Sequence, residues 1–366
     1  MKMADLAKRY SSQKYLLNII DTFYSIALIL IVLGSGLCIS LENFIKVFNL
    51  PGYLSIALFL LIILFFYYLL SLPLNFYAGY TLEHKFNLSN QKIGSWWQDQ
   101  LKSGILGYVI SLILISGFYW ILIKIEQWWL AISIFWILFS VILAKLTPVL
   151  IIPLFFKYKK LEDEALRQRI FSLAQKMQIK LLDVFEIDFS KKTLKANAAF
   201  TGMGKTKRVI LADTLKDRYN HDEVEAILAH EFAHFQLKHI LKLIALNSLL
   251  TLGLFYLIFI TSPYLLGVFR LSSLTQLASL PMVFLYFLIF GIIMQPIEAY
   301  VSRRFERQAD ALALKTTQNK ESFISLMDKL AAQNLADRNP NPLIKFFFFD
   351  HPPIDERIKS ANSHSI

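Results

Sequence analysis

The sequence predicts a mainly α-helical protein that crosses a membrane several times and carries a small α+β domain outside the bilayer. Of its 366 residues, 55% are hydrophobic and only 18% are charged, which is too apolar for the surface of a soluble protein of this length. A membrane helix needs about 20 apolar residues. Windows of this kind lie at 15–41, 53–79, 104–125, 128–156, 240–262 and 277–300.

The apolar windows divide the chain into four parts. Residues 1–156 form an N-terminal membrane region with about four helices, and residues 240–300 hold two further membrane helices. The polar segments 157–239 and 301–366 are each short for an independent hydrophobic core. We therefore expect these two segments to fold together.

Local patterns inside the first polar segment predict a small α+β unit. Residues 161–178 have apolar side chains at helical spacing, whereas 182–187 and 209–211 are short strand-like runs. Residues 222–241 have a helical pattern that runs without a breaker toward the fifth membrane helix. The residues with metal-binding chemistry lie on this last helix.

The distribution of Lys and Arg predicts the orientation, because short cytoplasmic loops carry most of the positive charge. Basic residues gather in the N-terminal segment and between the second and third helices, whereas the outward connections carry one each. An even number of helices then places both polar segments in the cytoplasm. The residues are Lys2, Lys8, Arg9 and Lys14, then Lys85, Lys92 and Lys102, and outside Lys46, Lys124 and Arg270.

Two other classes of partner are disfavoured. The net charge of +11 would suit nucleic acid, but the aromatic residues lie in the apolar spans and not along a basic stripe. Residues 199–206 differ by one position from a phosphate-binding loop, but Ala199 replaces the first glycine and a strand-like run follows where a helix is needed. We expect neither nucleic acid nor a nucleotide to bind.

The segment His230-Glu231-Phe232-Ala233-His234 matches the zinc motif H-E-x-x-H. Side chains at positions i and i+4 share one face of a helix, so both imidazoles can bind one zinc ion. Glu231 lies beside the first ligand and is expected to take the proton from water activated by the metal. His239 lies five residues after His234 and so leaves the metal-facing side of that helix; both His239 and His84 are expected to be structural or interfacial.

A catalytic zinc needs a third protein ligand, so that water keeps the fourth position. Glu306 is the candidate, because it directly follows the sixth membrane helix on the same side of the bilayer. Asp310 lies one turn further and can accept the free ring N–H of a ligand histidine. The alternative for both is a solvated helix in which neighbouring arginines are their salt-bridge partners.

At these residues the sequence resembles the type I CAAX prenyl endopeptidases, membrane zinc proteases of the gluzincin type. The resemblance extends in order over almost the whole chain. The matching blocks are residues 83–87, 97–102, 153–155 with Lys157, 197–198, 207–211, 302–310, and 351–353 with Glu356 and Arg357.

The resemblance implies a helical bundle around a water-filled chamber, capped on the cytoplasmic side by a zincin-like catalytic domain with one Zn²⁺ per chain. It implies removal of the C-terminal tripeptide after a prenylated cysteine of a peptide or lipidated protein. Asn197 and Ala198 match the substrate-binding strand. His351 matches a histidine that stabilises the oxyanion, and Arg357 supports it; otherwise His351 is a loop histidine before a helix.

Two features of the eukaryotic members are expected to be missing, namely one further membrane helix at the start and a longer insertion before the zinc helix. The short loops favour a bacterial source and hence the bacterial inner membrane, whereas a eukaryotic source would imply the endoplasmic reticulum. In a bacterium without prenylated proteins, CAAX cleavage would be a capability and not the physiological role.

Two rival functions stay open. A quality-control zinc protease would cut misfolded membrane proteins without requiring a prenyl group. A transporter or inactive scaffold would use the same fold for binding lipid or peptide, but the intact Glu231 and the lack of an internal repeat argue against it.

Overall fold

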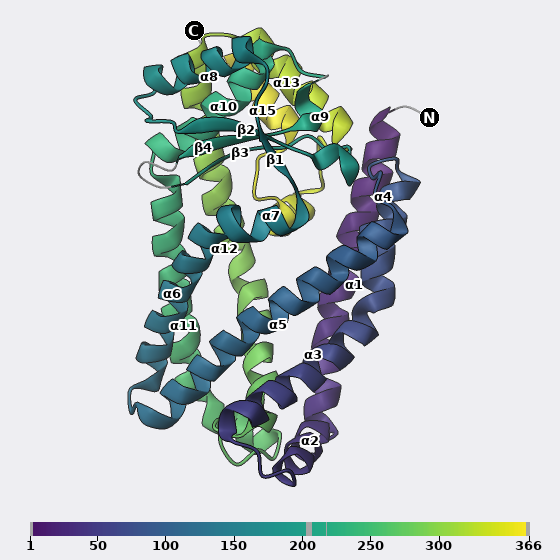
Figure 1. Ribbon diagram of the computed structural model, residues 1–366, viewed down its shortest axis with the longest axis vertical. Helices are drawn as coiled ribbons and strands as arrows, with labels where there is room; N and C mark the ends of the chain where they lie inside the picture. Colours follow the sequence, from purple (N-terminus) through teal and green to yellow (C-terminus); the bar gives the residue numbers. More distant parts are fainter. Residues whose placement is uncertain (1–2, 203–206, 217, 364–366) are drawn as a thin grey trace.

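The computed structural model describes residues 3–202, 207–216 and 218–363 (Figure 1). In this part of the chain six helices are long and apolar enough to cross a membrane, which confirms the predicted number. Three spans are single helices: α1 (Met3–Gly34), α5 (Ile93–Lys124) and α11 (His239–Val268). Two spans contain a π-helical turn: α3 (Gly52–Phe76) continues through Tyr77–Thr81 into α4 (Leu82–Lys85), and α6 (Trp128–Leu146) continues through Thr147–Ile151 into α7 (Ile152–Phe155). The sixth span is α12 (Leu280–Thr317), which a short turn (Leu277–Ser279) precedes.

The membrane helices have two distinct ends. The N-terminus and α4 lie at the same end as the mixed α+β domain, which we call the cap (Figure 1). The short helix α2 (Leu37–Lys46) and the α5–α6 and α11–α12 connections lie at the opposite end. The basic segments of the N-terminal half therefore share one end with the cap.

The cap contains a four-stranded sheet in the order β1-β2-β4-β3. The strands are β1 (Tyr158–Lys160), β2 (Asp183–Ile187), β3 (Ala198–Thr201) and β4 (Arg208–Ala212). β2 and β4 are parallel, and the outer strands β1 and β3 pair antiparallel to them. β3 is thus an edge strand. The segment 199–206, which resembles a phosphate-binding loop, is only partly described, because residues 203–206 lie outside the described part of the chain.

Helices from both polar segments surround this sheet and share one hydrophobic core. They are α8 (Glu164–Lys176), α9 (Asp213–Lys216), α10 (His221–Gln236), α13 (Lys320–Gln333), α14 (Pro342–Phe348) and α15 (Ile354–Ser363), with a 3₁₀ turn at Phe189–Lys191. Val184, Phe232 and Phe323 are among the buried residues of the core. Neither segment buries these side chains alone, which explains why they pack together.

A capping box fixes the start of α10. The Asn220 side chain accepts from the Glu223 backbone N–H, and the Glu223 carboxylate accepts from the Asn220 backbone N–H, both at 2.9 Å. Ser325 and Lys329 of α13 bind the same carboxylate at 2.6 and 2.7 Å. The helix that carries the two histidines is therefore anchored to the second polar segment.

The predicted unbroken helix over 222–241 is wrong. α10 ends at Gln236, Lys238 adopts a left-handed conformation with φ of 56°, and α11 begins at His239. For a residue with a side chain this conformation costs about 1–2 kcal/mol. A lysine at this position therefore gives no indication in the sequence that the helix is interrupted there. The break lets α10 pack in the cap while α11 enters the membrane region.

By contrast, α12 runs without a break from the membrane into the cap. Its 38 residues correspond to a length of about 57 Å, nearly twice the hydrocarbon thickness of a bilayer. Its second half carries Glu306 and Asp310, both buried, and packs against α10. This one helix therefore couples the membrane region to the candidate site.

Candidate metal centre

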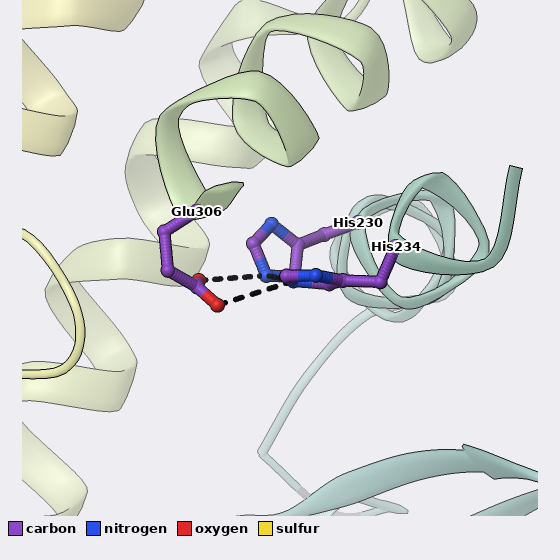
Figure 2. A group of neighbouring side chains, drawn as sticks. All are labelled: His230, His234 and Glu306. Atoms are coloured by element: carbon purple, nitrogen blue, oxygen red, sulfur yellow. Dashed lines mark hydrogen bonds and ion pairs between the residues drawn. The ribbon is translucent and has the colours of Figure 1, made fainter. Parts of the chain in front are cut away.

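Three side chains from α10 and α12 converge on one point (Figure 2). Nε2 of His230 lies 3.1 Å from one carboxylate oxygen of Glu306, and Nε2 of His234 lies 3.2 Å from the other. The two Nε2 atoms are 3.1 Å apart. The ligand atoms of the three residues all lie within 4.8 Å of one another, as a shared metal ion requires.

The chemistry of this donor set fits a metal cation. Two imidazoles and one carboxylate direct lone pairs at each other, and Oε2 of Glu306 is buried without a hydrogen-bond donor among the described residues. A bound cation would satisfy these groups together. Three protein ligands also leave a coordination position free for water, as in catalytic sites.

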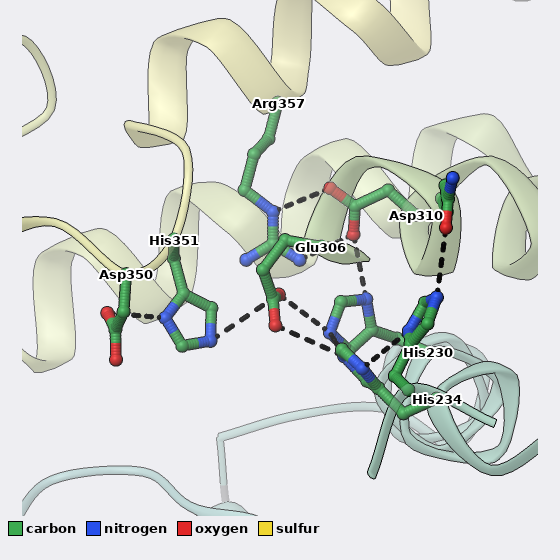
Figure 3. Close-up of polar contacts among 9 residues, drawn as sticks. His230, His234, Glu306, Asp310, Asp350, His351 and Arg357 are labelled. Carbon is green, nitrogen blue, oxygen red and sulfur yellow. Dashed lines mark hydrogen bonds and ion pairs between the residues drawn. The ribbon is translucent and has the colours of Figure 1, made fainter. Parts of the chain in front are cut away.

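Asp310 and Arg357 form a second layer behind His230 (Figure 3). Oδ1 of Asp310 lies 2.8 Å from Nδ1 of His230, and Arg357 donates to both carboxylate oxygens at 2.6 and 2.8 Å. Burial alone would lower the pKa of His230, but the neighbouring carboxylates of Asp310 and Glu306 outweigh it and raise the pKa to about 9. The same contact with Asp310 directs the Nε2 lone pair of a neutral His230 toward the metal position.

Glu231 follows the first histidine on α10 and is partly buried. Burial raises the pKa of Glu231 above its ordinary value. A carboxylate whose pKa lies nearer to neutrality is a better proton acceptor at physiological pH. Glu231 is therefore suited to general-base chemistry beside the metal group.

His351 approaches the metal group from the loop before α15 (Figure 3). Its Nε2 lies 3.4 Å from Oε2 of Glu306, and its Nδ1 lies 2.8 Å from Asp350. Burial opposes the charge on His351, but Asp350 and Glu306 outweigh it and raise its pKa. Arg303 of α12 fixes this loop, because it donates to the backbone carbonyls of Lys345 and Phe349.

Arg357 does not contact His351 through any hydrogen bond among the described residues; its guanidinium binds Asp310. Its support of the site is therefore through the His230 side, in contrast to the role that the resemblance implied. Asn197 and Ala198 lie where β3 begins, and the Asn197 carbonyl accepts from Ala212 at 3.0 Å. Phe200 of β3 packs against Phe232 of α10, so this edge strand lies beside the helix with the two histidines.

His239 was expected to point away from the metal side, because it lies five residues after His234 on a continuous helix. The break at Lys238 removes that geometry. Nδ1 of His239 lies 3.1 Å from Nδ1 of His234, and its Nε2 lies 3.0 Å from the side-chain oxygen of Gln308. The buried ring also stacks on Phe305 at 4.4 Å.

These contacts are consistent with one chain of hydrogen bonds. If Nε2–H of His239 donates to Gln308, its Nδ1 accepts from Nδ1–H of His234. Nε2 of His234 then carries the lone pair that faces the metal position. His239 thus performs for His234 the orienting function that Asp310 performs for His230.

Two protein-family models match the chain, one over its N-terminal membrane region and one over the rest. Residues 160–365 match the model of peptidase family M48, and residues 2–157 match that of the CAAX prenyl protease N-terminal region, five membrane helices. The chain is 31% identical to the uncharacterized metalloprotease YhfN of Bacillus subtilis over 99% of this chain and 86% of that protein.

Two yeast proteins are also similar. CAAX prenyl protease 1 of Saccharomyces cerevisiae is 32% identical over 80% of this chain and 69% of its own length. The crystal structure of Ste24p from S. mikatae matches with a TM-score of 0.86 and 28% identity, over 98% of this chain and 88% of that one. The similarity therefore covers the membrane helices and the cap together.

Replacement of His239 tests its orienting function. His239→Phe keeps a ring against Phe305 but removes the acceptor for His234, so we expect Zn²⁺ affinity to fall about 10- to 100-fold. His239→Asn places an amide oxygen near the former Nδ1 position and should restore most of the affinity. Competition with a chromophoric zinc chelator measures the dissociation constants.

His84→Asn is the control, because in the described part of the chain the ring of His84 lies against Tyr80 and bonds to the Tyr80 carbonyl, on α4. Its zinc affinity should equal that of the unmodified protein. An unchanged affinity in His239→Phe would show that His234 needs no such partner.

Proposed function

We propose a zinc-dependent mechanism for this chain, which belongs to peptidase family M48 and is a membrane metalloendopeptidase related to CAAX prenyl protease 1. Membership confirms the resemblance found in the sequence. The single observation that carries the mechanism is the convergence of His230 and His234 of α10 with Glu306 of α12, the helix that continues directly from the membrane region.

Zinc is the metal that this donor set suits best. Two imidazole nitrogens and one carboxylate oxygen form the ligand set of a well-known class of zinc peptidases. When bound, zinc lowers the pKa of a water to about 7 and polarises the carbonyl of the scissile bond. One Zn²⁺ per chain is therefore proposed.

Three further catalytic roles are proposed for side chains around the metal group. Glu231 accepts the proton of the attacking water and returns it to the leaving nitrogen. His351 donates a hydrogen bond toward the negative charge that develops on the carbonyl oxygen. Asp310, held by Arg357, keeps His230 in the orientation that binds metal.

The substrate is proposed to lie along β3. Among the described residues no strand pairs with the outer edge of β3, and an extended peptide can add to such an edge through backbone hydrogen bonds. Asn197 and Ala198 stand at the start of the strand and would contact the peptide close to the scissile bond. Phe200 keeps the strand against α10.

The cap is proposed to lie in the cytoplasm. The N-terminal end of α1 lies at the end of the membrane region that carries the cap (Figure 1), and the first turns of this helix contain Lys8, Arg9 and Lys14. Positive charge near short loops favours the cytoplasmic side. If the source is a bacterium, the membrane is the inner membrane; otherwise the endoplasmic reticulum is proposed.

The proposed substrate is the C-terminus of a peptide or protein that carries a prenylated cysteine. The support is the similarity to CAAX prenyl protease 1 over four fifths of this chain. Hydrolysis would release the tripeptide after that cysteine.

Two substitutions separate catalysis from metal binding. Glu231→Gln should retain one Zn²⁺ per chain but lose activity by at least about 100-fold, because it removes the proton acceptor and no ligand. Glu306→Ala should lose both metal and activity. Metal analysis of purified protein beside peptide cleavage reports the two effects, and full zinc occupancy in Glu306→Ala would rule out this ligand set.

A farnesylated CAAX peptide tests the substrate. We expect detergent-purified, zinc-loaded protein to cleave it after the farnesyl-cysteine, and to cleave the same peptide without the lipid much more slowly. Glu231→Gln and a chelator-treated sample are the controls. Equal cleavage of both peptides would favour a quality-control protease that needs no prenyl group.

A further inference from the structure

We propose that a cavity beside the metal group binds a basic side chain of the substrate, so that the enzyme prefers peptides with Lys or Arg close to the scissile bond. The inference rests on the proposed peptidase function and specifies its substrate. The cavity has a volume of about 340 Å³ and lies between α11, α12 and α14 and the loop that carries His351.

The position of the cavity connects it to the reaction. Glu298 and Ser302 line it from α12, and they share one helical face with Glu306 because the three residues are four apart. Asp350, which binds His351, also lines the cavity. A group in this cavity would therefore be close to the proposed oxyanion donor.

The lining has the two parts that a long basic side chain requires. Phe347 and Phe348 of α14 supply aromatic surface along which a hydrocarbon stem can lie and near which a cation is stabilised. Glu298 and Asp350 supply negative charge. Asn247 of α11 and Gln295 of α12 add further polar groups from two facing helices.

The two carboxylates differ in whether they already have a hydrogen-bond or ion-pair partner. Asp350 already binds His351, whereas Glu298 has no hydrogen bond or ion pair to another of the described residues. Arg303, the basic residue nearest to this wall in sequence, binds backbone carbonyls of α14 and its following loop instead. Glu298 is thus the carboxylate available for a substrate cation.

A charged side chain at the position of Glu298 is costly unless it has a function or a partner. It lies in the long apolar helix that forms the sixth membrane span, where ionisable residues are rare and usually face a cavity or a substrate pathway. Here it faces the cavity, with an exposed side chain. A bound Lys or Arg would neutralise it.

The spacing along α12 predicts which substrate position is involved. Glu306 lies eight positions after Glu298, which is about 12 Å along the helix axis. An extended peptide rises about 3.3 Å per residue. The basic residue should therefore lie within four residues of the bond that is cut.

The test compares peptides that carry Lys or norleucine at each position within four residues of the scissile bond. The zinc-loaded full chain should prefer Lys at one of these positions, with kcat/KM about two- to fivefold higher. Glu298→Gln should remove this preference while still cleaving the norleucine peptide. Glu298→Lys should instead prefer Glu at the same position.

Glu126→Gln is the matched control, because Glu126 is exposed in the connection between α5 and α6 and has no ion pair among the described residues. It should retain the preference for Lys. Cleavage without any charge preference, or a preference that Glu298→Gln retains, overturns the inference alone. Zinc-loaded protein that cleaves none of the peptides contradicts the peptidase function as well.

Discussion

The meeting of α10 and α12 places two imidazoles and a carboxylate in a space where their electron-rich atoms lie about 3 Å apart. Such a group is unfavourable in a buried position unless a cation compensates it. The rest of the cap serves this geometry. The Asn220–Glu223 capping box anchors α10 to α13, and Arg357 of α15 holds the carboxylate that orients His230.

The membrane helices and the cap are joined by more than the continuous α12. Glu83 of α4 accepts from Tyr10 of α1 at 2.6 Å and pairs with Lys195, just before β3, at 2.8 Å. Asp99 of α5 pairs with Lys192 at 2.6 Å. These contacts tie the segment leading into β3 to helices of the N-terminal half, so the position of β3 depends on how the membrane helices pack.

Much of this arrangement follows from sequence patterns, and the exceptions have physical causes. The spacing of His230 and His234 requires one helix face, and the apolar windows require membrane helices, so both could be predicted. Strand β3 could not be predicted from periodicity, because four residues at a sheet edge show little of it, and only the family resemblance implied a strand at Asn197 and Ala198. His239 was misjudged because only tertiary packing stabilises the left-handed Lys238, which no local preference reveals.

The central claim is that His230, His234 and Glu306 together bind one zinc ion. Zinc K-edge X-ray absorption on the stoichiometrically loaded protein tests it most directly. We expect two imidazole nitrogens with oxygen ligands from a carboxylate and water, all at about 2.0–2.2 Å. A sulfur ligand at about 2.3 Å, or a third imidazole in the coordination shell, would contradict it.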